Sequence, residues 1–169
     1  MSKSVYLAGP AVFHPAARQV FEYLVEMCTK HGLTAITPEI GDLDLSKLSK
    51  PEQAALIRAQ NVAKIHAADA VIACISPFRS PGADAGTAWE MGYAEALGKP
   101  VVAWSEQADD YRARVAADVD PEGTYWCRQH GMIVEDFGLT DNLMLTAGPH
   151  PVEPDFEAAV KAAAKLLGV

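Results

Sequence analysis

The stretch that decides the fold is residues 70–92, AVIACISPFRSPGADAGTAWEMG. Its first six residues are apolar on both faces, which is typical of a central strand in a parallel sheet. Residues 77–86 are rich in proline, glycine and serine, and they predict a turn-rich loop. A helix is expected over residues 87–97, because Lys99 and Pro100 then break the pattern. The segment therefore predicts a strand, a loop and a helix in succession, as in a βαβ unit.

The same alternation continues toward both ends of the chain. Further strands are predicted at residues 4–8, 34–37, 101–104 and 132–134. Further helices are predicted at residues 15–31, 51–66 and 108–115, and a closing one is marked by Phe156, Val160, Ala163 and Leu167. Strands that alternate with helices form right-handed βαβ units and a parallel sheet. We expect one α/β domain over residues 1–169, a flavodoxin-like three-layer sandwich with a five-stranded parallel sheet.

Composition narrows the class of protein. The chain has 169 residues, with 14 basic and 22 acidic side chains and a net charge of −8. That balance argues against nucleic-acid binding, which relies on Lys and Arg at phosphates. No apolar run approaches the roughly 20 residues of a membrane span, and the start MSKSVYLAGP lacks the features of a signal peptide. Three cysteines without a CxxC spacing fit reduced thiols. We expect a soluble cytoplasmic protein without nucleic-acid or membrane partners.

Two loops are candidates for a ligand site. In an open α/β sheet, ligands bind beyond the carboxyl ends of the strands, which points to residues 9–14 and 76–86. The second loop contains Asp84 and leads to Glu90. An ionised carboxylate in a small dry site suits a glycosidic nucleophile, which attacks an anomeric carbon and forms a sugar ester. We expect Glu90 in the first helical turn, where the helix dipole favours its ionised form. The same position fits an ordinary acid on a solvated helix face.

Three more side chains near these loops each have two interpretations. Tyr6 is a core residue unless its hydroxyl reaches the strand ends. Phe13 could stack on a base or cover the sheet, and Arg79 could bind an anion or be an ordinary loop cation. The sequence has no GxGxxG, Walker A, GxSxG or HExxH motif, and its five histidines never pair at metal-ligand spacing. We therefore predict no cofactor and no metal site.

Three segments taken together resemble one enzyme family. They are YLAGPAVFHP (residues 6–15), QNVAKIHAADAVIACISPFRSPGADAGTAWEMGYAEALGKPV (residues 60–101) and FGLTDNLML (residues 137–145). Their D-x5-E spacing, the G-Y-A that follows and the later N-x-M resemble the nucleoside 2-deoxyribosyltransferases, especially the shorter members with AGPAVF and SPFR motifs. The resemblance covers nearly the whole chain. It implies a flavodoxin-like fold and base exchange between deoxyribonucleosides through a covalent deoxyribosyl-enzyme.

The resemblance also implies roles for individual residues. Glu90 matches the nucleophile, and Tyr6 matches the hydroxyl that orients it. Asp84 matches the acid that contacts the nucleoside through its sugar hydroxyls. Gly9 and Phe13 match the loop that lines the base pocket.

Two further correspondences concern the neighbouring subunit and the base. Asn142 and Met144 match the N-x-M pair that reaches a neighbour's active site, which implies a homo-oligomer based on dimers, such as a tetramer or hexamer.

Asn61 stands where several members carry an aspartate proposed to protonate the departing base. An amide hydrogen-bonds but is no general acid near neutral pH. We hypothesise that Asn61 recognises the base while Asp84, water or another group supplies the proton. Alternatively, Asn61 is a polar helix position without a ligand.

The implied chemistry leaves the fate of the sugar ester open. Attack by a second base gives a transferase of nucleoside salvage, whose substrates are deoxynucleosides and free nucleobases. Attack by water gives an N-glycosidase of deoxynucleosides or nucleoside 5′-monophosphates, and Arg79, Ser80 and the amides near Gly82 could hold a phosphate. The stretch PGADAGTAWE also loosely resembles the PGGxGTxxE motif of phosphoribohydrolases, with Ala83 in place of its second glycine. A third alternative is a nucleotide-binding module without turnover. Purine or pyrimidine preference is not predicted.

Overall fold

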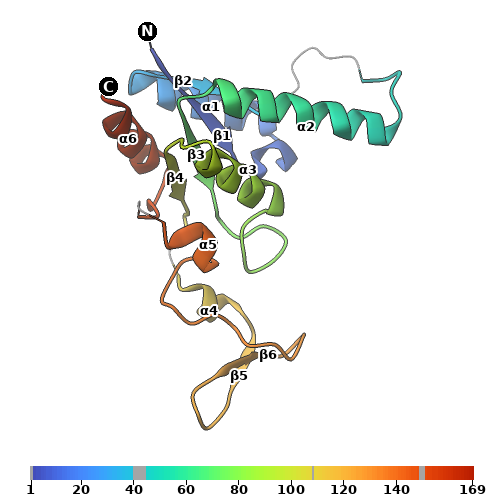
Figure 1. Cartoon of the computed structure of the whole chain (residues 1–169), viewed down its shortest axis with the longest axis vertical. Helices are drawn as coiled ribbons and strands as arrows, with labels where there is room; N and C mark the ends of the chain where they lie inside the picture. Colours follow the sequence, from blue (N-terminus) through green and yellow to red (C-terminus); the bar gives the residue numbers. More distant parts are fainter. Residues whose placement is uncertain (1, 40–44, 108, 149–150) are drawn as a thin grey trace.

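The computed structural model describes residues 2–39, 45–107, 109–148 and 151–169 (Figure 1). A parallel sheet forms its centre, built from β1 (Lys3–Ala8), β2 (Leu33–Ile36), β3 (Ala70–Cys74) and β4 (Val101–Trp104). The strand order is β2-β1-β3-β4, and every neighbouring pair is parallel. From β1 the chain passes to β2 on one side and then crosses back to β3 on the other side of β1, so the direction of strand addition reverses between β1 and β3. Such a switch point opens a crevice at the carboxyl ends of the two strands.

Helices cover both faces of this sheet (Figure 1). They are α1 (Ala17–Lys30), α2 (Lys50–Ala67), α3 (Ala85–Ala96) and α6 (Phe156–Leu167). Val5 and Leu7 of β1 pack in one core cluster with residues of α1 and α6, whereas Tyr6 and Ala8 pack in the other with residues of α2 and α3. Side chains alternate along a strand, so consecutive residues of β1 serve opposite layers. The predicted three-layer α/β sandwich is confirmed.

The predicted fifth strand is wrong. The central sheet has four strands, and residues 132–134 form no part of it. Ile133 makes a single antiparallel bridge to Trp126, and Met132 and Ile133 are mostly exposed. A short apolar run predicts burial, but here the side chains lie on a projecting segment. The place beside β4 is taken by Glu153, which exchanges backbone hydrogen bonds with Ala103 and Ser105 at 2.9 and 3.0 Å.

Residues 111–146 form an arm that projects beyond the carboxyl end of β4, at the bottom of Figure 1. Its elements are α4 (Tyr111–Arg114), the antiparallel pair β5 (Ala117–Val119) and β6 (Tyr125–Cys127), and α5 (Leu143–Thr146). A short 3-10 helix, Pro10–Phe13, lies outside the arm and follows β1. The predicted helix at residues 108–115 is therefore only one turn long, and Ala108 lies outside the described residues.

Local sequence signals explain the ends of the long helices. Ser49 and Glu52 form a capping box before α2, and Pro51 occupies the first turn, as expected. Helix α1 ends ahead of Gly32, whose φ of 76° suits glycine after a helix terminus. These signals lie within a few residues of the helix ends that they specify. The sequence therefore predicted the start of α2 and the end of α1 to within one or two residues.

The structure also describes the three cysteines and the lengths of the helices. Cys28, Cys74 and Cys127 are all free. Burial raises the pKa of Cys28 to about 12, which keeps this thiol protonated and unreactive at neutral pH. None of the described helices is long and apolar enough to cross a bilayer.

Asp69, just before β3, provides a pH-dependent link between two neighbouring strands. Its carboxylate accepts hydrogen bonds from the Ser4 backbone at 2.8 Å and the Ser4 hydroxyl at 3.0 Å, and it pairs with Lys3 at 3.0 Å. These bonds lower the pKa of Asp69 to about 2. A lowered pKa stabilises the folded state above the unfolded-state pKa, and this stabilisation is lost as the pH falls toward 2.

We predict that Asp69→Asn lowers the free energy of unfolding at neutral pH by about 1 kcal/mol, the value of a charged hydrogen bond reduced for partial exposure. Urea unfolding at several pH values should show the difference from wild type shrinking as the pH falls below about 4. Glu22→Gln, which removes an exposed pair with Arg18, is the matched control and should change stability little. A constant difference at every pH would contradict the electrostatic explanation.

Candidate active site

A buried tyrosine and a glutamate meet at the carboxyl end of the sheet. Tyr6 lies in β1 and is 0% exposed, and its hydroxyl donates a 2.7 Å hydrogen bond to Oε1 of Glu90. Glu90 is the sixth residue of α3, because this helix begins at Ala85, earlier than predicted. The first-turn position expected for Glu90 is therefore wrong, and the carboxylate points from the second turn onto the sheet rather than outward.

Burial controls the electrostatics of this pair. It raises the pKa of Glu90, the hydrogen bond from Tyr6 opposes that rise, and the nearby charge of Asp84 adds to it. The helix dipole expected to favour ionisation is outweighed, since its effect is concentrated in the first turn. Burial and the adjacent carboxylate also raise the pKa of Tyr6 well above its usual range. Tyr6 therefore remains a neutral donor to the partly buried carboxyl group of Glu90.

Asp84 is the N-cap of α3. Its Oδ2 accepts hydrogen bonds from the backbone N–H of Thr87 at 3.0 Å and from the Thr87 hydroxyl at 3.3 Å. Aspartate three residues before threonine is a common cap pattern, and Thr87 is itself buried. The cap holds Asp84 at the end of the loop, six residues or about 1.7 turns before Glu90.

One pocket contains both acids. It has a volume of about 730 Å³, and five of the predicted residues line it: Gly9, Phe13, Asn61, Asp84 and Glu90. Gly9 permits the loop after β1 to cross the end of β3, because a Cβ there would lie 2.9 Å from Cβ of Cys74. The sequence did not indicate Val12 and Ile57, which complete the apolar wall and carry no chemical signal of their own.

Asn61 of α2 presents an unmet hydrogen-bonding group to this pocket. Its Oδ1 is buried and has no hydrogen-bond partner among the described residues. A buried acceptor without a donor costs free energy, so such an atom calls for an explanation. A ligand with an N–H group in the pocket would provide the missing donor. As a polar helix position without a ligand, Asn61 would keep this buried oxygen without a donor.

Arg79 does not line the pocket with Glu90. Its guanidinium lies over the rings of Phe13 and Phe78, 4.9 and 4.5 Å from their centroids, and the two rings stack at 5.3 Å. Its backbone φ of 57° is unusual for a residue other than glycine. Arg79 thus covers an aromatic pair that joins the loops after β1 and β3, and Phe78 is a residue of this edge that the sequence analysis missed.

Asn142 and Met144 lie on the arm, outside the lining of the pocket with Glu90. The Asn142 side chain caps α5 by accepting from the Met144 backbone at 3.0 Å, and it donates to Glu135 at 2.5 Å. Met144 is 77% exposed. Within one chain, therefore, this pair does not join the other predicted site residues.

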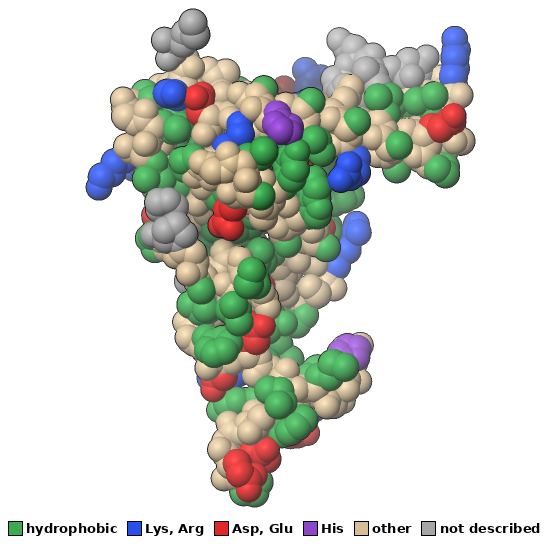
Figure 2. Space-filling view, viewed as in Figure 1, with side chains coloured by type: hydrophobic (Ala, Val, Ile, Leu, Met, Phe, Trp, Pro, Cys, Tyr) green, Lys and Arg blue, Asp and Glu red, His purple; other side chains and the backbone are tan. Residues whose placement is uncertain are grey.

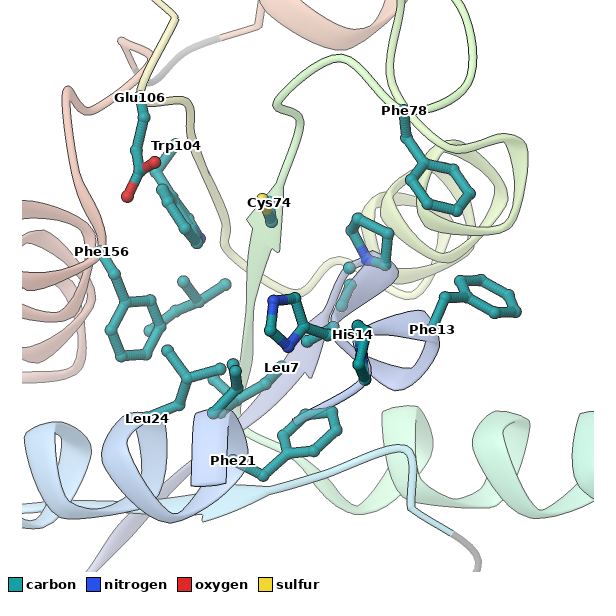
Figure 3. Close-up of a pocket in the computed structure, with 17 residues that line it drawn as sticks. Leu7, Phe13, His14, Phe21, Leu24, Cys74, Phe78, Trp104, Glu106 and Phe156 are labelled. Carbon is teal, nitrogen blue, oxygen red and sulfur yellow. The ribbon is translucent and has the colours of Figure 1, made fainter. Parts of the chain in front are cut away.

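A second pocket, of about 490 Å³, opens on the opposite face of the sheet (Figure 3). Figure 3 shows Trp104 and Phe156 on one side of it, His14 at its centre and Phe13 and Phe78 on the other side. Gly9 and Phe13 line both pockets, so the loop after β1 separates them. Of these two pockets, only the first is lined by Asp84 and by Glu90, whose carboxylate is hydrogen-bonded to the buried Tyr6; Glu39 is a third acid in its lining. Among the described residues, no group of three His, Cys, Asp or Glu side chains could hold a metal ion.

The fold and the pocket together define an α/β protein with a small-molecule pocket lined by Asp84 and by the Glu90 carboxylate that Tyr6 holds. The model of the nucleoside 2-deoxyribosyltransferase family matches residues 5–144, and the chain belongs to that family. The matched region includes both acids, the tyrosine, Asn61 and the Asn142–Met144 pair.

Similar proteins support this assignment. A 2-desoxiribosyltransferase from Leishmania mexicana is 34% identical, with a TM-score of 0.77, and the match covers 96% of this chain and 97% of that one. A conserved protein from Enterococcus faecalis shares the fold, with 24% identity, a TM-score of 0.57 and 99% coverage of both chains. An uncharacterized protein from Schizosaccharomyces pombe is 34% identical over 113 residues, which are 66% of this chain and 54% of that protein. The match thus spans about half the length of the yeast protein.

We predict that Glu90→Gln stabilises the fold at neutral and alkaline pH. The raised pKa means that the folded state binds a proton more tightly than the unfolded one, so stability falls as the pH rises through that range. Glutamine cannot ionise, and its oxygen still accepts from Tyr6. Urea unfolding should give the variant a higher free energy of unfolding than wild type at about pH 8. This difference should vanish near pH ~4. The control is Glu95→Gln on the exposed face of α3. A variant less stable than wild type at pH 8 would refute the burial argument.

Proposed function

We propose that the chain transfers a 2-deoxyribosyl group between nucleobases through an ester on Glu90. The observation that carries the proposal is the 2.7 Å bond from Tyr6 to Glu90 in a pocket that also contains Asp84. Membership of the family and the similarity to the Leishmania protein over nearly the whole of both chains support it. The substrates would be deoxynucleosides and free nucleobases, and the reaction needs no cofactor.

The chemistry follows from the two oxygens of the carboxylate. Tyr6 holds Oε1, which leaves Oε2 to attack the anomeric carbon of the sugar. The bond from that carbon to the base breaks, its electron pair leaves with the base, and the base gains a proton. A second base then attacks the same carbon and releases Glu90. Burial raises the pKa of Glu90, while the Tyr6 hydrogen bond opposes that rise and orients the carboxylate.

Asp84 and Asn61 would hold the two halves of the nucleoside. One oxygen of Asp84 is occupied by Thr87, and its carboxylate would accept from a sugar hydroxyl. The unpaired Oδ1 of Asn61 would accept from an N–H or amino group of the base. Because an amide cannot protonate the departing base, that proton would come from Asp84, water or another group.

A second subunit would complete the site. Asn142 and Met144 do not line the pocket of their own chain, as expected of a pair that enters a neighbour's pocket. Figure 2 shows apolar side chains gathered over the arm, and Trp126, Met132, Ile133 and Phe137 are among its exposed apolar residues. Apolar surface of this kind suits contact with another copy of the chain. We therefore propose a homo-oligomer in which each arm serves a neighbouring site.

The location of Arg79 bears on the alternative substrate. A nucleoside 5′-monophosphate needs cationic or amide groups near its phosphate. Arg79 is stacked on Phe13 and Phe78 and lies outside the lining of the pocket with Glu90. This favours an uncharged nucleoside over a monophosphate. Hydrolysis of the same sugar ester by water remains an outcome that the following experiment distinguishes.

We predict that the protein converts deoxyinosine and free adenine into deoxyadenosine and hypoxanthine. Chromatography of the reaction mixture measures the products. Release of hypoxanthine without a new nucleoside would instead indicate an N-glycosidase, and binding without reaction would indicate a nucleotide-binding module. Glu90→Ala should lower turnover by at least about a thousandfold, because it removes the nucleophile. Glu95→Ala on the same helix is the control. A fully active Glu90→Ala variant would exclude the proposed ester.

We predict that Asn61→Ala changes base selection more than sugar chemistry. Loss of the buried acceptor should reduce kcat/KM by about tenfold for bases that carry the matching donor, and less for bases without it. The measurement compares exchange rates for a panel of purine and pyrimidine acceptors. Gln60→Ala, the preceding residue on α2, is the matched control. Unchanged base preference and turnover in Asn61→Ala would remove Asn61 from the site.

A further inference from the structure

Asp141 is a buried acid on the arm that the site described above does not use. It precedes Asn142 in the chain, and only 4% of its surface is exposed. A buried carboxylate is costly unless hydrogen bonds and an opposite charge compensate it. The hydrogen-bond partners of Asp141 therefore indicate which segments this carboxylate positions.

The two oxygens of Asp141 hold two different segments. Oδ2 accepts from the backbone N–H of Ala83 at 2.8 Å, and Ala83 immediately precedes Asp84. Oδ1 accepts from the backbone N–H of Asn142 at 2.7 Å. One side chain thus bridges the loop that ends at Asp84 and the segment that carries Asn142 and Met144.

Arg114 of α4 binds the same two segments from the other side. Its guanidinium lies 3.7 Å from Oδ2 of Asp141, and it is 10% exposed. It donates to the carbonyl of Pro81 at 2.9 Å, in the loop before Asp84, and also to the carbonyl of Thr140, next to Asp141. The ion pair is therefore surrounded by backbone groups of both segments, which compensates its burial.

We propose that Asp141 is a positioning residue that couples two active sites. Through Ala83 it sets the loop of Asp84 in the pocket of its own chain, and through Asn142 it sets the pair given to a neighbour. This inference rests on the proposed function, in which Asn142 and Met144 act in the neighbouring site. A carboxylate is required because it accepts at both ends, whereas an asparagine amide accepts at one end only.

Complementation between subunits separates the two effects of Asp141. Glu90→Ala and Asn142→Ala variants are mixed, unfolded and refolded together, so that some sites combine Glu90 of one subunit with Asn142 of the other. Asp141→Asn is then added either to the Glu90→Ala subunit, which donates Asn142, or to the Asn142→Ala subunit, which provides Glu90 and Asp84. Deoxyinosine–adenine exchange is the assay.

We expect Asp141→Asn to raise KM for the deoxynucleoside by about tenfold in both arrangements, because each loses one charge-assisted hydrogen bond at a binding segment. A merely structural role would reduce the amount of assembled enzyme, and would lower the maximal rate with KM unchanged. Asp136→Asn is the control, because Asp136 pairs with Arg112 on the surface of the arm and contacts neither segment.

A second variant keeps the test valid if Asp141→Asn does not fold. A methyl group at Gly82 would lie 3.2 Å from Oδ1 of Asp141, so Gly82→Ala pushes the loop from the carboxylate without removing the charge. Because Oδ1 also accepts from the backbone N–H of Asn142, Gly82→Ala should raise KM about fivefold in both arrangements.

The outcomes separate this inference from the function on which it rests. No recovery in the parent mixture would overturn the shared site, and the coupling with it. Recovery that Asp141→Asn leaves unchanged in both arrangements would overturn the coupling alone. A rise in KM in only one arrangement would reduce Asp141 to the positioning of a single segment and would also refute the coupling.

Discussion

The pairing of β1 with β3 is the constraint on which the candidate site depends. The two strands are parallel and in register from Val5 and Ala70 to Ala8 and Ala73, so both end at the same edge. The chain order reverses between them, and their loops therefore diverge and leave a crevice. Alternation along β1 then directs Tyr6 to the layer of α2 and α3, where Glu90 lies. A shift of one residue in this register would turn Tyr6 to the other face.

The site balances two opposing requirements on one carboxylate. Burial excludes water from Glu90 but raises its pKa, and the Tyr6 hydroxyl counteracts this rise by donating to Oε1. Asp84 contributes a second negative charge close by while it caps α3. A pocket of this kind stores unfavourable free energy in the folded state, since a neutral residue at position 90 would fit it better. Such a cost is common at functional sites, where geometry serves chemistry before stability.

In the proposed homo-oligomer, the arm would relate the pocket of one chain to that of a neighbour. It projects from the carboxyl edge of the sheet and exposes apolar side chains, including Met144, yet its base is fastened to the loop before Asp84 by Asp141 and Arg114. The same segment that would reach a neighbour is thus anchored beside the pocket of its own chain. Two short hydrogen bonds to Asp141 connect the backbone of this segment to the loop before Asp84.

The sequence by itself determined the layered fold, the loops of the switch point and the identity of the residues that gather there. These features follow from short-range patterns: apolar runs, helix caps, and glycine and proline at turns. It misplaced the fifth strand, because a run such as Met132–Val134 looks the same whether the core or a partner covers it. It also could not locate Glu90 within its helix or find Asp141. Burial, and a hydrogen bond between residues 58 positions apart, exist only once the chain is folded. The tertiary structure decided which acids are buried, what each one holds, and that Asn142 and Met144 do not line the pocket of their own chain.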